Sequence, residues 1–351
     1  MAYEKKNIKA VIEDINSRKI YLPAIQRKYV WDDDQITRLM DSIMLGYPIG
    51  TFLFWKVRKS IINKKEYSMY EFIKDFHERD VYKNPSAPQP FPIGSDEETI
   101  WAVLDGQQRL TSLYIALQGS MSRKLPNKRW KNDDAFPIKE LYLDLHSQRT
   151  DEEDISYEFK FLTQEEAKKQ KDDKLWYLVK DILKYSQDEL VTDLIIPNGW
   201  ASDKVAKKNI SLLHTRLVGD EIINYFEVQT DSIDSVLDIF VRVNSGGTVL
   251  SKSDLLFSTI VSHWDKARDE IDKLLAEINK IGEGYKFSND FIMRTCLYVL
   301  DMSVTLKVET FKKESVLKIK NNWENIRKTI KDTVDLLNEF GFNSENIISY
   351  V

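Results

Sequence analysis

Short apolar runs alternate with amphipathic helical segments through the first 250 residues, and this alternation constrains the fold more than any other feature. Apolar residues recur every three or four positions over Asp34–Leu45, which predicts a helix, and the apolar run Thr51–Val57 predicts a strand. A second strand is predicted over Thr99–Leu104, directly before another helical stripe. Beyond Leu250 the pattern becomes almost wholly helical, so we place a domain boundary near residue 250.

Composition excludes several classes of protein. The chain has 351 residues, 42% of them hydrophobic, and can bury a core large enough for one big domain or two modest ones. Its 51 Lys and Arg against 56 Asp and Glu give a net charge of -5, so any nucleic-acid contact must come from a local patch. The only cysteine, Cys296, excludes an internal disulfide and fits a reducing cytoplasm. No apolar run predicts a signal peptide or a membrane span.

The turn between the second predicted strand and its helix is Asp105-Gly106-Gln107-Gln108-Arg109. Backbone N–H groups and the positive end of the helix dipole favour an anion here, and Gly106 lets a ligand approach the backbone. Arg109 could reach the same anion, while Asp105 could hold a divalent cation or a ribose hydroxyl. In the alternative interpretation, Asp105 caps the helix and the glutamines form its solvated first turn.

The segment Leu22–Trp31 combines amide, guanidinium and aromatic groups beside a proline that fixes the backbone. Arg27 suits bidentate recognition of a phosphate, and Tyr29 or Trp31 could stack on a nucleobase. Alternatively, Arg27 pairs with the aspartates at 32–34 and both aromatic rings belong to the core. The residues alone leave both interpretations open.

A third segment, Phe240–Ser251, contains a Gly-Gly pair that could form an anion-binding nest. Arg242 and Asn244 would project polar groups from the end of the preceding helix, or the glycines could simply form a C-capping turn. No Walker P-loop occurs in the sequence, and its four histidines do not have the spacing of a zinc site or an HNH nuclease centre.

Four motifs in this order resemble the N-terminal domain family of the GmrSD restriction endonucleases. They are Pro23–Arg27 with Tyr29 and Trp31, Gly46–Gly50, Asp105–Arg109, and Phe240–Gly247. The resemblance spans roughly residues 8–260. It implies an α+β, ParB/sulfiredoxin-like nucleotide-binding domain over residues 1–250, followed by a mostly helical region over 251–351. Because the chain ends on apolar residues, we expect the natural protein to continue into a further, nuclease domain.

The resemblance also implies a function, namely binding and hydrolysis of a nucleoside triphosphate with Mg²⁺ to control restriction of modified phage DNA. Asp105, Gln107, Gln108 and Arg109 would be catalytic, with Asp105 as the magnesium ligand and a glutamine orienting water. Arg27 and Arg109 would neutralise triphosphate charge. The full phosphate-contacting set would comprise Gln26, Arg27, Gly106, Arg109, Arg242, Asn244, Gly246 and Gly247.

Two other functions compete with this one. The same arginines could hold DNA phosphates while Tyr29 stacks on a base, in a DNA-binding or modification-sensing module without enzymatic activity. A ParB-like nuclease acting through Asp105 is the second alternative. The expected partners are a nucleoside triphosphate, DNA and a nuclease domain in the same or another chain; the protein could form a homo-oligomer, and no membrane is expected.

Overall fold

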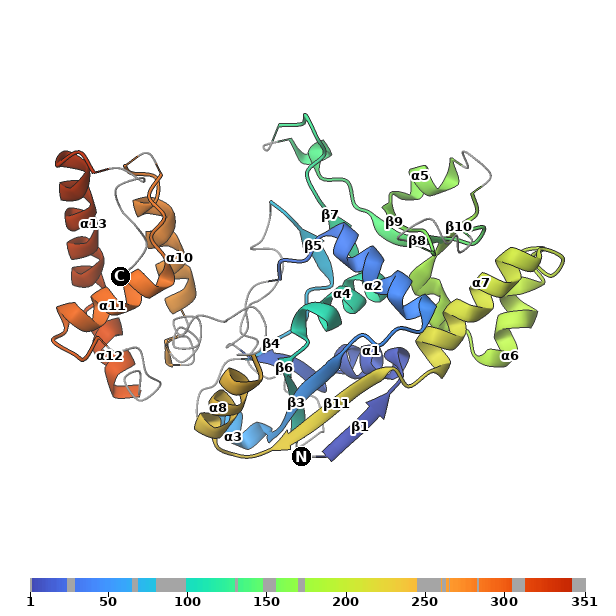
Figure 1. Ribbon diagram of the computed structural model, residues 1–351, viewed down its shortest axis with the longest axis horizontal. Helices are drawn as coiled ribbons and strands as arrows, with labels where there is room; N and C mark the ends of the chain where they lie inside the picture. The colour runs from blue at the N-terminus through green and yellow to red at the C-terminus, as the bar shows by residue number, and fades with distance from the viewer. Residues whose placement is uncertain are drawn as a thin grey trace. The chain divides into compact units, whose positions relative to one another are not determined.

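The structure is a computed structural model that describes most of the chain. The described residues are 2–23, 29–64, 69–79, 99–129, 132–147, 156–169, 174–244, 260, 263–264, 266–282, 284–304 and 313–342. They belong to two compact units. The first unit comprises Met1–Leu22, Lys28–Val57 and Tyr70–Thr230, and the second comprises Pro23–Arg27, Arg58–Met69 and Asp231–Val351. Figure 1 labels the helices and strands and colours them by their position along the chain.

A mixed six-stranded sheet carries the fold, in the order β1-β11-β3-β6-β2-β4. Its strands are β1 (Ala2–Lys6), β2 (Ile20–Pro23), β3 (Thr51–Arg58), β4 (Met69–Tyr70), β6 (Thr99–Asp105) and β11 (Ile223–Gln229). Strand β1 runs antiparallel to β11, whereas β11 with β3 and β2 with β6 pair in parallel. All six positions of β3 between its two end residues are buried or half-buried, as expected for an interior strand of such a sheet.

Three helices share one hydrophobic core with this sheet: α1 (Ile8–Asn16), α2 (Asp33–Leu45) and α4 (Gln107–Gln118). Helix α1 begins where the Asn7 side chain accepts a hydrogen bond from Ala10 N at 2.7 Å. Helices α1 and α2 bury one apolar stripe each, whereas α4 is buried along most of its length. Helix α4 is therefore an interior element of the first unit (Figure 1).

Smaller elements complete the first unit. An antiparallel sheet in the order β10-β8-β9 contains β8 (Glu140–Asp144), β9 (Phe159–Leu162) and β10 (Trp176–Leu178). A parallel pair joins β5 (Asp75–His77) to β7 (Ser120–Ser122). The helical elements are η1 (Asp133–Ala135), α5 (Gln164–Lys168), η2 (Val179–Lys184), α6 (Gln187–Glu189), η3 (Leu190–Ile195), α7 (Lys204–His214) and η4 (Thr215–Gly219). Both η3 and η4 are π-helical.

The described elements that lie wholly within the second unit are all helices. Its helices are α3 (Lys59–Lys64), α8 (Ile233–Asn244), α10 (Ala267–Ile278), α11 (Asn289–Val299), α12 (Lys313–Asn321) and α13 (Trp323–Glu339). The rings of Trp264 and Trp323 meet edge to face in its core, with centroids 5.1 Å apart. Among the helices that the structure describes in either unit, none has both the length and the apolar character that crossing a membrane requires.

The predicted α+β class and the helical C-terminal region are confirmed. The helix predicted over Asp34–Leu45 is α2, and the two predicted strands are β3 and β6. The domain boundary near residue 250 stays a prediction. Along the chain the second unit takes over at Asp231, and it also includes two earlier segments.

Candidate functional site

The junction between β6 and α4 depends on a glycine. Gly106 has a φ of 89° and a ψ of 10°, a left-handed conformation that side chains rarely adopt. A Cβ at this position would lie 2.3 Å from Cδ1 of Phe52. No side chain caps the helix in the structure as described, so the interpretation in which Asp105 is the cap is not what is observed. The residue at the start of α4 therefore offers no side-chain oxygen to the backbone N–H groups of the first turn.

The guanidinium of Arg109 is held from two sides. Its Nη1 donates to the carbonyl oxygen of Ile49, and its Nη2 donates to that of Thr51 at 3.0 Å. The same Nη2 lies 3.5 Å from Oδ2 of Asp105. Arg109 thus joins the start of β3 to the first turn of α4 with its charge fixed in place.

Two neighbours shape the space around Arg109. Its guanidinium carbon lies 4.5 Å above the ring of Phe52, in a cation–π arrangement. Gly50, with a φ of 81°, makes room for it, because a Cβ there would lie 2.4 Å from Nη1. Desolvation by burial lowers the pKa of Arg109, and the nearby Asp105 carboxylate raises it again in part. A guanidinium nonetheless keeps its proton in proteins, so Arg109 is a fixed positive charge beside the helix start.

The segment after the first motif docks on the same turn. Gln108 Oε1 accepts a hydrogen bond from Val30 N at 3.0 Å, and the hydroxyls of Tyr29 and Ser112 are 2.8 Å apart. The Tyr29 ring packs against Phe76, with ring centroids 5.7 Å apart. Residues 29–30 and the first turns of α4 therefore form one packed unit, although about 80 positions separate them in sequence.

Both aromatic residues assigned to base stacking are partly or fully enclosed by protein. Tyr29 is 8% exposed, and burial raises the pKa of its hydroxyl well above the ordinary value. Trp31 is half-buried, and its carbonyl accepts from Arg123 Nη2 at 2.9 Å. Arg123 also pairs with Asp33 at 2.7 Å. A stacking role for either ring stays a prediction.

The sequence comparisons now identify the family. The sequence model described as GmrSD restriction endonuclease, N-terminal domain, matches residues 8–261. The chain belongs to this family. An uncharacterized protein of Methanocaldococcus jannaschii is 25% identical over 271 residues, which are 73% of this chain and 41% of that protein. The chain thus spans about two fifths of the length of the curated relative that it matches.

In this GmrSD N-terminal domain, three of the four motifs can be located with respect to one another. Residues 29–31, Gly46–Gly50 and Asp105–Arg109 meet around the first turn of α4, through the contacts of Gln108 and Arg109. Gln107 is 8% exposed, whereas the Asp105 side chain is 36% exposed. The carboxylate is therefore the more accessible of the two to a ligand.

The remaining predicted residues are not placed at this turn. Gln26 and Arg27, as well as Gly246 and Gly247, lie outside the described residues. Arg242 is exposed on α8 in the second unit, and Asn244 is the last residue of that helix. Their roles in a GmrSD-type site stay predictions.

Sequence reasoning missed the backbone partners of Arg109. The carbonyls of Ile49 and Thr51 carry no side-chain signal, because any residue offers a carbonyl oxygen. Gly50 and Gly106 were the usable signal in the sequence. Both have positive φ, and both border the space that Arg109 and Phe52 fill.

The arrangement suits a metal-bound polyphosphate. The positive end of the helix dipole attracts anionic oxygens, and the fixed charge of Arg109 adds to that field. Magnesium ions are commonly held by one or two carboxylates together with substrate phosphates, so the half-exposed Asp105 carboxylate fits a magnesium ligand. No other acidic residue lies in the first turn of α4 to oppose an anion.

Proposed function

We propose that this chain binds a nucleoside triphosphate with Mg²⁺ at the start of α4 and hydrolyses it to control a DNA restriction nuclease. The observation that carries the proposal is the β6–α4 junction, where an uncapped helix start lies between the Asp105 carboxylate and the Arg109 guanidinium. Membership of a restriction endonuclease family supports the link to a nuclease.

Each group has a distinct task in this proposal. The positive end of the α4 dipole attracts a phosphate, and Asp105 holds the magnesium ion that the phosphates share. Arg109 acts as a preorganised charge rather than a mobile finger, because two backbone carbonyls hold it. Gln107 or Gln108 orients the attacking water.

Residues beyond the junction complete the proposed site. Gln26 and Arg27 are separated from Tyr29 only by Lys28 in sequence, and Tyr29 and Val30 are bonded to α4. We assign these two residues to the outer phosphates, where a bidentate guanidinium is most effective. We also assign Arg242, Asn244, Gly246 and Gly247 to nucleotide phosphates, and the nuclease would act on modified phage DNA.

Calorimetric titration with ATP, GTP, CTP and UTP, each with Mg²⁺, tests the proposal. At least one nucleotide should bind and release phosphate, and Asp105→Asn should lower the affinity about tenfold or more, which corresponds to about 1.4 kcal/mol. The matched control is Asp188→Asn, at an exposed aspartate of α6. If none of the four nucleotides binds, the proposal is wrong.

A second candidate, direct DNA contact, is favoured by a basic loop after β7. Arg123 anchors the base of this loop to Trp31 and Asp33, while Lys128 and Arg129 are exposed at its tip. No ion pair of either tip residue with another described residue is observed. Exposed cations of this kind suit DNA phosphates.

This candidate makes a separate measurement possible. If the loop contacts DNA, the combined substitution of Lys128 and Arg129 by alanine should weaken binding to a duplex. The slope of the logarithm of affinity against the logarithm of salt concentration should correspond to about two fewer released counterions. Equal affinity and equal salt dependence in the variant would remove the loop from consideration. Nucleotide binding should be the same in both proteins.

A further inference from the structure

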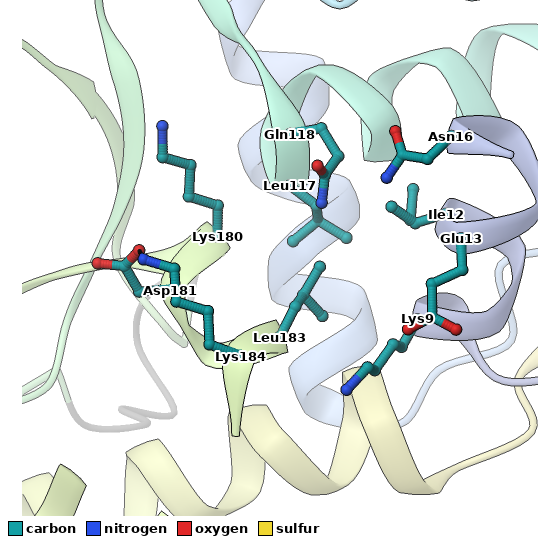
Figure 2. Close-up of a pocket in the computed structure, with 10 residues that line it drawn as sticks. All are labelled: Lys9, Ile12, Glu13, Asn16, Leu117, Gln118, Lys180, Asp181, Leu183 and Lys184. Carbon is teal, nitrogen blue, oxygen red and sulfur yellow. Dashed lines mark hydrogen bonds and ion pairs between the residues drawn. The ribbon is translucent and has the colours of Figure 1, made fainter. Parts of the chain in front are cut away.

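A cavity of about 410 Å³ lies at the opposite end of α4 from Gly106. It opens between α1, the end of α4 and η2, all within the first unit (Figure 2). Ile12, Leu117 and Leu183 form an apolar floor from these three elements, in which Leu183 is partly exposed whereas Ile12 and Leu117 are buried. Its volume is within the range of about 300–1,000 Å³ that small-molecule sites occupy.

Amide and charged side chains surround this floor on different sides. Figure 2 shows the amides of Asn16 and Gln118 on one side of the aliphatic side chains, and Lys9 with Glu13 on the other. Asn16 Oδ1 accepts from the Tyr114 hydroxyl at 2.8 Å, which fixes the amide and leaves its N–H groups as donors. Within the described residues, neither the Gln118 amide nor the Lys9 ammonium has a hydrogen bond or a close ion pair, although Lys9 interacts electrostatically with Glu189.

The other charges of the cavity are already neutralised. Lys180 is bonded to Glu140, and its side chain extends away from the centre of the cavity (Figure 2). Lys184 donates to Asp181 at 2.6 Å, and that carboxylate raises the pKa of Lys184. The groups that remain to meet a ligand are therefore one ammonium, one carboxylate and two amides.

We propose that this cavity binds a nucleoside monophosphate. The amides of Asn16 and Gln118 can pair with the donor and acceptor edge of a base, as such side chains do with adenine. The apolar floor covers the face of the ring. Glu13 accepts from ribose hydroxyls, a task that an acidic residue performs in dinucleotide sites, and Lys9 meets the phosphate.

The charge of the cavity selects for a single phosphate. Only Lys9 is available as a cation, and the Glu13 carboxylate on the same helix would repel a triphosphate. The site is also separate from the one proposed at Gly106, because the eleven positions from Gln107 to Gln118 extend about 16 Å along a helix. The two sites would therefore respond to different substitutions.

Binding of AMP, GMP, CMP and UMP, without metal, tests the inference by calorimetry up to millimolar concentration. At least one should bind, and Gln118→Leu, which keeps the size of the side chain, should weaken it about tenfold. Lys9→Ala should weaken the monophosphate about fivefold or more and leave the parent nucleoside unchanged, while Lys9→Arg restores binding. Lys207→Ala, at an exposed lysine of α7, is the control.

Circular dichroism of each variant shows that it is folded. If no monophosphate binds, or if Gln118→Leu and Lys9→Ala bind as the unchanged protein does, the inference is wrong. Binding that Asp105→Asn abolishes would place the ligand at the Gly106 junction instead and would also overturn it. Conversely, loss of triphosphate binding alone would contradict the proposed function and leave this inference standing.

Discussion

Helices α2 and α4 begin in opposite ways. Asp32 caps α2 by accepting a hydrogen bond from Gln35 N at 2.8 Å, and the Gln35 side chain accepts one from Asp32 N at 3.0 Å. Two further aspartates lie in the first turn of α2. Helix α4 begins after Gly106 with neither a side-chain cap nor an acidic residue in its first turn.

The difference shows how a helix start can be stable without a cap. A side-chain cap typically contributes about 0.5–2 kcal/mol, which α2 gains and α4 lacks. Tertiary contacts stabilise the first turn of α4 instead. Gln108 accepts a hydrogen bond from Val30, and Arg109 donates one to the start of β3. The N-cap residue of α4 consequently supplies no side-chain acceptor to the first turn, and the tertiary contacts take over its stabilising role.

Gly106→Ala should disturb this arrangement most. A left-handed alanine costs about 1–2 kcal/mol, and forcing a Cβ against the buried Phe52 ring adds about 1–3 kcal/mol. We expect the free energy of unfolding, measured with urea, to fall by roughly 2–5 kcal/mol. Gly199→Ala is the matched control, because Gly199 has a φ of 73° but nothing within 4 Å of the added Cβ. Equal losses in the two variants would mean that Phe52 does not restrict the junction.

Arg109→Lys should have the next largest effect. An ammonium cannot reproduce the fork that binds two carbonyls at once, so one of them loses its charged donor. The expected loss is roughly 2–3 kcal/mol in urea denaturation. Arg58→Lys, in the half-exposed ion pair with Asp231, should change stability by less than about 1 kcal/mol. A comparable loss at both positions would contradict the role given to the fork.

Asp32→Ala removes the cap of α2 and should lower the free energy of unfolding by about 1 kcal/mol. Asp32→Asn keeps an oxygen that can accept from Gln35 N, and should lose only a few tenths of that amount. Thermal unfolding followed by circular dichroism compares the two. The contrast between α2 and α4 would be weakened if Asp32→Ala proved neutral.

The smallest expected effect concerns α7, another helix with a side-chain cap. Hydrogen bonding from the backbone of Ala206, and then from His146, lowers the pKa of its cap, Asp203. The cap therefore contributes its stability above the ordinary aspartate pKa of about 3.9, and this contribution is lost as pH falls through the lower folded-state value. The stability difference between the unchanged protein and Asp203→Asn should be below about 1 kcal/mol at pH 7. It should shrink in acid, and a difference independent of pH would contradict this.

Much of the local structure was predictable from sequence because its signals are local. The stripes of α2 and α4 and the apolar runs of β3 and β6 follow from periodicity, and the Asp105–Arg109 turn was correctly placed between a strand and a helix. Helix α1 was not predicted, although Ile8, Val11, Ile12 and Ile15 form a stripe that could have indicated it.

Other features depend on contacts between distant parts of the chain. The acceptors of Arg109 lie about 60 positions away in sequence, and the burial of Tyr29 depends on Ser112 and Phe76. The π-helices η3 and η4 have no periodic signature that distinguishes them from ordinary helix. These arrangements become visible only once the chain is folded.

The burial of α4 also has a mechanical consequence. Its residues from Leu110 to Leu117 are enclosed by protein, so the helix can be displaced only as a rigid rod. A ligand that pulls on the first turn must then move Leu117 and Gln118 at the far end, and the reverse holds equally. Whatever occupies one end would change the affinity at the other by the same factor, as thermodynamic linkage requires.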